Sequence, residues 1–240
     1  MGRMQKLLAL IRQGNFRLIW QKGTDYLRHR LYTVSAIRRD KRYGGVSVNK
    51  LIPSKHTAEG AYATQSSDYR CLDQVFAAVP LRPDDVFVDV GCGEGRVLTY
   101  LCEQGFRGSI TGIELDADAA KTAIRRTAGC PNVSVCVGNV LEHGELFRNA
   151  TAVYLFNPFD RAVVHAFVQM LETVSEKPVR FYYLNSQYAD ELGARWTLLS
   201  EGVIRRPSIL PMQYTVHALR REQNSPGDVQ CTQNGLSGGC

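Results

Sequence analysis

Strand-like and helix-like segments alternate regularly from residue 86 to residue 184, and this alternation constrains the fold more than any other feature. Short runs rich in Val, Ile, Phe and Tyr predict strands at residues 86–90, 109–115, 133–138, 152–156 and 179–184. Segments with helical periodicity lie between them, at about residues 95–104, 117–127 and 160–174. Repeated β–α units of this length predict an α/β fold with a mostly parallel, doubly wound sheet and helices on both faces.

The alternation ends in the last third of the chain. Residues 196–221 contain two strand-like runs joined by a short Pro-containing connection, so we expect them to pair antiparallel at the sheet edge. We divide the chain into a basic helical N-terminal arm (1–45), a linker or lid (46–68), an α/β domain (69–221) and a disordered tail (222–240). The tail is rich in Gly, Ser, Asn and Gln, which favours disorder.

Positive charge is concentrated in the first 42 residues. They contain eleven Lys and Arg against Asp25 and Asp40, while the whole chain carries only +6, so the remaining residues are net acidic. Apolar residues at helical spacing predict two or three short helices, broken at Gly14–Asn15 and near Gly23–Thr24. Such an arm can bind an anionic partner, either a membrane surface or a nucleic acid, or it can pack on the domain with its basic side in solvent.

Cysteine usage and hydropathy exclude several other classes of protein. No window approaches eighteen uninterrupted apolar residues, so no transmembrane segment is predicted. The seven cysteines form no Cys-x-x-Cys pair and are odd in number, which argues against a disulfide framework and against a zinc site. We therefore expect no bound metal and a reducing, cytoplasmic location.

Three glycines at alternate positions, Gly91, Gly93 and Gly95, follow the first predicted strand in the stretch VDVGCGEGR. Ligands of open α/β sheets bind at this place, beyond the carboxyl ends of the strands, and glycine lets the backbone approach them closely. The dinucleotide pattern Gly-x-Gly-x-x-Gly is not met, because an arginine stands at its third glycine. Asp89 and Glu94 would repel a pyrophosphate, so the loop favours a ligand with an ammonium or sulfonium group.

VDVGCGEGR resembles the first motif of the class I S-adenosylmethionine-dependent methyltransferases, in which the glycine loop holds the aminocarboxypropyl end of the cofactor. The resemblance covers about residues 62–220 and includes Glu114 after the second strand and Asn139 after the third. It implies that Glu114 binds both ribose hydroxyls and that Asn139 replaces an acidic residue beside the adenine. The cofactor-binding residues that it implies are Asp89, Gly91, Cys92, Gly93, Glu94, Gly95, Glu114, Leu115, Asn139 and Val140.

A second motif, AVYLFNPFD, lies at the end of the fourth predicted strand. Its Asn157–Pro158 resembles the first half of the Asn-Pro-Pro-aromatic motif of methyltransferases that act on planar amines of nucleobases or glutamine. The resemblance implies that the Asn157 side-chain oxygen and the Pro158 carbonyl accept hydrogen bonds from the amine, while Phe159 lines the acceptor slot. Alternatively, these residues form only a strand-to-helix turn in which Asp160 is the helix N-cap. We predict Asn157, Pro158 and Phe159 as the catalytic residues.

The polar stretch before the domain is interpreted either as an exposed linker or as a lid whose Tyr62 and Thr64 hydrogen-bond the cofactor carboxylate. The leading hypothesis is an S-adenosylmethionine-dependent methyltransferase, with N-methylation of a protein side chain, a nucleobase or a small molecule as the favoured reaction. A non-catalytic cofactor-binding partner protein is the alternative, and a nicotinamide oxidoreductase fits the glycine spacing less well. The methyl acceptor and the oligomeric state are open at this stage.

Overall fold

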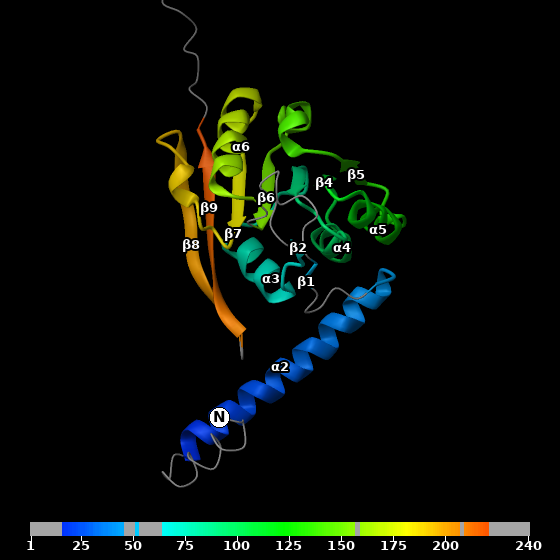
Figure 1. Cartoon of the computed structure of the whole chain (residues 1–240), viewed down its shortest axis with the longest axis vertical. Coiled ribbons are helices and arrows are strands. Elements are labelled where there is room, and N and C mark those ends of the chain that lie inside the picture. Colours follow the sequence, from blue (N-terminus) through cyan, green and yellow to red (C-terminus); the bar gives the residue numbers. More distant parts are fainter. Residues whose placement is uncertain (1–15, 46–50, 53–63, 157–158, 207–208, 221–240) are drawn as a thin grey trace, which may run out of the picture.

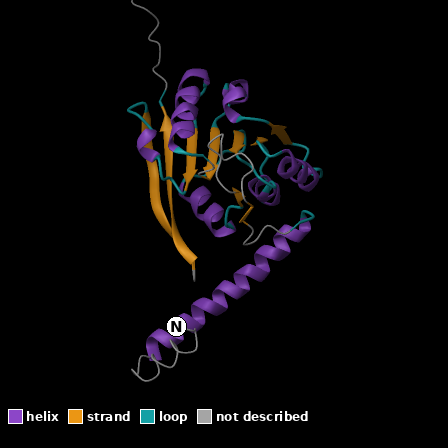
Figure 2. Ribbon diagram, in the orientation of Figure 1, coloured by secondary structure: helices purple, strands orange, loops and turns teal. Residues whose placement is uncertain are grey.

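The computed structural model contains a central seven-stranded sheet with the strand order β5-β4-β3-β6-β7-β9-β8 (Figures 1 and 2). The structure describes residues 16–45, 51–52, 64–156, 159–206 and 209–220. The parallel strands are β3 (Val86–Val90), β4 (Ser109–Glu114), β5 (Val133–Val137), β6 (Ala152–Phe156) and β7 (Arg180–Leu184). Each strand expected from the alternation is therefore present, and the prediction of a mostly parallel sheet is confirmed.

The last two strands form a long hairpin at one edge of the sheet. Strand β8 (Trp196–Arg206) pairs with β9 (Ile209–Leu219), and β9 also pairs antiparallel with β7. The predicted antiparallel pairing at the sheet edge is confirmed, with β8 outermost.

Helices cover both faces of the sheet, because successive strand residues point to opposite sides and both sides are apolar. One core contains side chains of α3 (Tyr69–Ala78), α4 (Arg96–Glu103) and α5 (Ala117–Thr127). The other contains side chains of α6 (Arg161–Val174) and of two 3-10 turns, η2 (Val140–Glu142) and η3 (Gly144–Phe147). A further turn, η4 (Ala189–Glu191), follows β7. The doubly wound arrangement is thus confirmed.

In the described part of the N-terminal arm, residues 16–42 form a single helix, α2 (Phe16–Arg42), so the predicted break near Gly23–Thr24 was wrong. The helix continues through Gly23–Thr24. An isolated glycine costs a helix only about 1 kcal/mol, and the Thr24 hydroxyl donates to the Gln21 carbonyl at 2.8 Å within the same helix. The other expected break, Gly14–Asn15, lies outside the described residues. No helix in the described part of the chain combines the length and the apolar character that crossing a membrane requires.

Part of the segment interpreted as a linker or lid forms a small antiparallel pair of strands, β1 (Leu51–Ile52) and β2 (Thr64–Gln65). The rest of residues 46–63 and the predicted tail, residues 222–240, lie outside the described residues. The division into arm, lid, catalytic domain and tail therefore stays a prediction.

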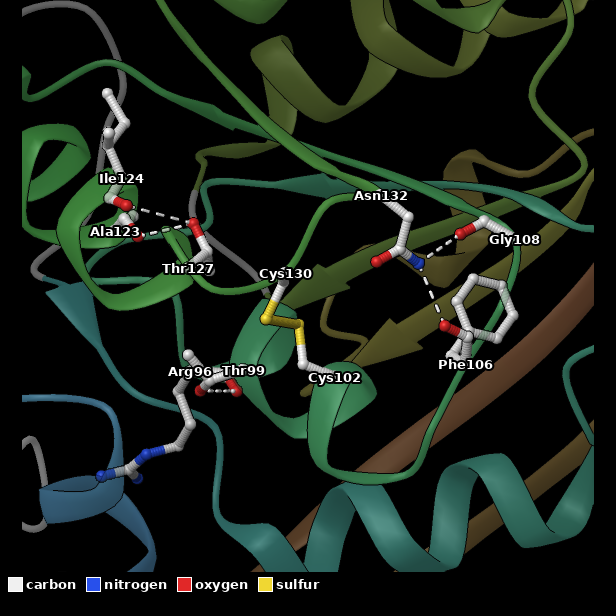
Figure 3. The surroundings of a disulfide bond; sticks show 10 residues. All are labelled: Arg96, Thr99, Cys102, Phe106, Gly108, Ala123, Ile124, Thr127, Cys130 and Asn132. Carbon is white, nitrogen blue, oxygen red and sulfur yellow. Dashed lines mark hydrogen bonds between the residues drawn. A yellow bond between two sulfur atoms is a disulfide. The ribbon is translucent and has the colours of Figure 1, made fainter.

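Cys102 and Cys130 form a disulfide, contrary to the expectation from the sequence (Figure 3). The bond joins the end of α4 to the loop after α5. These two helices lie on the same face of the sheet, so residues 28 positions apart become neighbours. Nearby, the side-chain amide of Asn132 donates to the carbonyls of Phe106 and Gly108 at 3.0 and 2.7 Å. The argument against a disulfide framework was therefore wrong for this pair, since a spacing of this length carries no sequence signal.

Candidate active site

The glycine loop lies at the carboxyl end of β3 and turns into α4. Gly91, Gly93 and Gly95 all have positive φ angles, of 71°, 54° and 83°. Residues with a Cβ rarely adopt this conformation, so the alternate glycines are a backbone requirement. The amides of Gly91 and Cys92 donate to the Ile113 carbonyl at 2.9 and 3.0 Å, which fixes the loop to the end of β4.

Gly95 has a second role, because it allows α4 to approach α5. A Cβ at this position would lie 2.9 Å from the Cβ of Ala123, closer than side chains normally pack. The third glycine of the loop therefore serves the packing of the two helices as well as the turn.

Asp89 is the buried carboxyl group of the site. It lies on β3 beside Tyr154 of β6 and is only 2% exposed. Within the part of the chain that the structure describes, its Oδ2 atom has no hydrogen-bond partner. Burial raises the pKa of Asp89 well above its ordinary range, and the negative charge of Glu114 raises it further. Leaving a buried carboxyl oxygen unsatisfied is costly, so this atom fits the ammonium group of an aminocarboxypropyl chain.

Glu114 ends β4 and holds the glycine loop in place. One of its carboxylate oxygens accepts from the Gly93 amide at 2.7 Å, and the other accepts from the Asp116 amide at 2.9 Å. Burial raises the pKa of Glu114, while these two backbone amides lower it. Each oxygen keeps a further lone pair, so Glu114 can still accept hydrogen bonds from a pair of hydroxyls.

Asn139 follows β5, as expected from the sequence. Its side-chain oxygen accepts from the Leu141 amide at 3.1 Å and caps the 3-10 turn η2. This bond holds the side chain at the edge of the sheet, with the amide nitrogen as its hydrogen-bond donor. Val140 is buried beside it and Leu115 is half-buried.

Glu94 and Cys92 occupy the loop in ways that the sequence alone did not indicate. Glu94 pairs with Arg126 of α5 at 3.1 Å, so its charge is balanced within the protein. Burial raises the pKa of the Cys92 thiol, and the charges of Asp89 and Glu114 raise it further. Asp89 and Glu114 are therefore the carboxyl groups that give the site its negative potential.

On the acceptor side, the structure describes only part of the predicted motif. Asp160 caps α6 by accepting from the Val163 amide at 3.0 Å, so its N-cap role is confirmed. Phe159 is half-buried and packs against the core that contains α6. Asn157 and Pro158 lie outside the described residues, as does Tyr62, and the side chain of Thr64 is not described. The roles of these four residues stay predictions.

A buried polar network behind the loop was missed in the sequence. Arg96 of α4 donates to both carboxylate oxygens of Asp40 on α2, at 2.6 and 3.2 Å, and to the Ser67 carbonyl at 3.1 Å. The Ser67 and Tyr154 hydroxyls lie 2.8 Å apart, and Tyr154 lies beside Asp89. This network connects the N-terminal helix to the floor of the site. Of these contacts, the sequence could have indicated only that Tyr154 lies beside Asp89, because the two residues are on neighbouring parallel strands.

Comparison with known proteins identifies the domain that carries this loop. Residues 87–176 match the family model of a methyltransferase domain. The ribosomal RNA small subunit methyltransferase A of Parasynechococcus marenigrum (strain WH8102) is 35% identical to this chain over 75 residues. That match covers 31% of this chain and 24% of the relative, so the chain spans about a quarter of the length of the curated protein that it matches.

Solved structures share the fold at low sequence identity. An RNA methyltransferase from Salinibacter ruber, in complex with S-adenosyl-L-homocysteine, superimposes with a TM-score of 0.53 and 17% identity, covering 65% of this chain and 95% of that one. TrmN from Thermus thermophilus has a TM-score of 0.54 and 12% identity, covering 62% and 48%. At these identities the likeness shows the fold alone. Residues 87–176 therefore match a methyltransferase domain, and the fold around them is shared with solved methyltransferases.

Proposed function

We propose that this protein transfers the methyl group of S-adenosylmethionine to an amine nitrogen held at the turn after β6. The observation that carries the cofactor half of the proposal is the buried Asp89 oxygen, which has no hydrogen-bond partner among the described residues and lies beside a loop of three glycines with positive φ. A positively charged ligand with a small, close-fitting end satisfies both features. S-adenosylmethionine supplies a methyl group that its sulfonium already activates for transfer.

The residues of the chain then mainly hold and orient the cofactor and the methyl acceptor. Asp89 accepts from the ammonium of the aminocarboxypropyl chain, and the remaining lone pairs of Glu114 accept from the ribose hydroxyls. The amide nitrogen of Asn139 donates to a ring nitrogen of the adenine. With the donor fixed at these points, catalysis consists of bringing the acceptor nitrogen into line with the methyl group and keeping water out.

The acceptor class rests on two supports. The resemblance of Asn157–Pro158 to the amine-methylating motif favours a nitrogen acceptor. The relative that methylates ribosomal RNA makes a nucleobase amine the first acceptor to test. The comparisons give no support to the alternative of a non-catalytic partner protein. The cytoplasmic location stays a prediction.

Incubation of the purified protein with methyl-labelled S-adenosylmethionine and a cell extract tests the proposal. We expect label in the RNA fraction and its loss after ribonuclease treatment. Label in the protein or small-molecule fraction would keep methyl transfer but change the acceptor. Measurable binding of S-adenosylhomocysteine without transfer into any fraction would instead support the non-catalytic alternative.

Replacing Phe159 by alanine is expected to reduce transfer about tenfold, because a stacked aromatic contributes roughly 1–3 kcal/mol to holding a base. The affinity for S-adenosylhomocysteine should not change, since Phe159 lies on the acceptor side. Phe159→Tyr, which keeps the aromatic face, is the matched control. An equal loss of cofactor affinity in Phe159→Ala would contradict the assignment of Phe159 to the acceptor slot.

Cofactor affinity is expected to rise with pH across the range in which Asp89 ionises. Burial and the charge of Glu114 raise the pKa of Asp89, so this range lies above the usual carboxyl values near pH 4. The sign for folding is opposite. Because the pKa of Asp89 is raised in the folded protein, its contribution to stability is fully present at pH values below its pKa in the unfolded chain. This contribution is lost as pH rises through its pKa in the folded protein. Calorimetric titration and thermal unfolding over one pH series should therefore show affinity rising while the stability of the free protein falls. An affinity that stays constant over the series would contradict the role of Asp89.

A further inference from the structure

The outer side of α2 carries a line of large apolar side chains in contact with solvent. Phe16, Trp20, Leu27, Leu31 and Val34 are 68%, 72%, 59%, 63% and 45% exposed. At 3.6 residues per turn, these positions fall within an arc of about 60° around the helix axis. We call these five residues the α2 apolar stripe. Exposed apolar residues that are aligned in this way mark an interaction surface more than scattered ones do.

The stripe faces outward because the opposite side of α2 is fixed to the domain. Ala36 and Asp40 are buried there, and the Tyr32 hydroxyl donates to Asp68 at the start of α3. Figure 1 shows α2 lying along the outside of the domain, with its amino-terminal half extending beyond α3 and α4. Among the described residues, the contacts that hold the helix therefore leave the stripe exposed to meet a partner.

Basic side chains flank the stripe on both sides. Helix α2 contains eight Lys and Arg and only two Asp. Arg39 and Arg42 pair with Glu103 of the domain. Arg28 lies 3.8 Å from Asp25 of the same helix. Further exposed basic residues along the helix are Arg17, Lys22, Arg30, Arg38 and Lys41. A partner of this surface must accept apolar side chains and carry negative charge.

We propose that α2 lies in the surface of an anionic membrane, with the α2 apolar stripe inserted among the lipids and the basic residues at the headgroups. A basic amphipathic helix with Trp, Phe and Leu on one side has the composition of helices that bind in the plane of a membrane. A nucleic acid would satisfy the basic residues but leave Leu27, Leu31 and Val34 in water. A second copy of the chain would bring two strongly basic helices together. The proposal is independent of the methyl acceptor, because it concerns the side of α2 that faces away from the domain.

Flotation with lipid vesicles tests the proposal, using phosphatidylcholine alone and phosphatidylcholine mixed with phosphatidylserine. We expect binding to the mixed vesicles only, weakened by salt. Trp20 and Trp196 are the two tryptophans of the chain, and Trp196 is buried, so a blue shift of the emission on binding reports insertion of Trp20. Equal binding to both kinds of vesicle, or no binding to either, would overturn the proposal.

Two double variants separate the apolar from the charged contribution. Leu27→Gln with Leu31→Gln should reduce binding at least tenfold without unfolding the protein, since both side chains are exposed. Arg28→Gln with Arg30→Gln should reduce it roughly 20-fold, while the matched pair Arg107→Gln with Lys121→Gln, on the domain, leaves it unchanged. If an RNA hairpin binds, and its binding depends on the arginines but not on the leucines, the partner is a nucleic acid. A dimer in sedimentation that the leucine variant dissociates would show a second copy instead, and either result overturns the membrane proposal.

Discussion

Replacing Asp89 by asparagine is expected to weaken the binding of S-adenosylhomocysteine about a hundredfold and, at the same time, to raise the melting temperature of the free protein. Hydrogen bonds to charged groups are worth about 1.5–3 kcal/mol, and 1.4 kcal/mol is tenfold in affinity. The stability gain follows from burial. Asp89 is buried near the negative charge of Glu114, and one of its oxygens has no hydrogen-bond partner in the part of the chain that the structure describes. An amide of the same shape removes the buried charge from the free protein.

Asp84→Asn is the matched control, because it makes the same chemical change at an exposed residue just before the amino end of β3. Calorimetry should show a loss of affinity, and thermal unfolding a higher melting temperature, in Asp89→Asn but not in Asp84→Asn. Unchanged affinity in Asp89→Asn would remove Asp89 from the cofactor site. A lower melting temperature would mean instead that Asp89 stabilises the free fold. The opposite movement of affinity and stability is therefore what distinguishes a ligand-binding carboxylate from a structural one.

The parts of the fold that follow from local periodicity could be predicted from the sequence. Strand β6 and helix α5 begin and end at the predicted residues, because each apolar run is bounded by turn residues. The positions of residues at strand ends could also be predicted. The sequence places Glu114 at the carboxyl edge of a parallel sheet, where ligands of this fold bind. The glycines at 91, 93 and 95 follow from the turn that needs them.

Features that depend on contacts between distant residues could not be predicted. From the sequence we expected Glu94 to add negative charge for the cofactor, but Arg126, which lies 32 positions later in the chain, pairs with Glu94. The Cys102–Cys130 bond likewise exists only because α4 and α5 are neighbours. Single-sequence patterns report local periodicity and spacing, and neither contains the partner of a side chain on another element. The electrostatics of the site were therefore harder to predict than its position.

Asp40→Ala is expected to lower the free energy of unfolding by about 3–5 kcal/mol, because it leaves the Arg96 charge buried without its partner. The side chains of Arg96 and Asp40 are only 6% and 2% exposed. The loss also removes the acceptor of the Tyr69 hydroxyl, at 2.7 Å. Arg42→Ala is the control within the same helix. Its side chain is 69% exposed, and exposed ion pairs contribute at most about 1 kcal/mol.

Denaturant unfolding of a double variant identifies the cause of this loss of stability. Asp40→Leu combined with Arg96→Met replaces the pair by apolar side chains and should be more stable than Asp40→Ala, because no isolated charge remains buried. The same variants connect α2 to the active site. Arg96 donates to the Ser67 carbonyl, and the Ser67 hydroxyl contacts the hydroxyl of Tyr154, which lies beside Asp89. Loss of Arg96 should therefore also weaken cofactor binding. If the double variant is as unstable as Asp40→Ala, the loss reflects packing between α2 and α4 rather than the unpaired charge. If it is stable but still binds the cofactor weakly, the network acts by holding Ser67 and Tyr154 at the floor of the site.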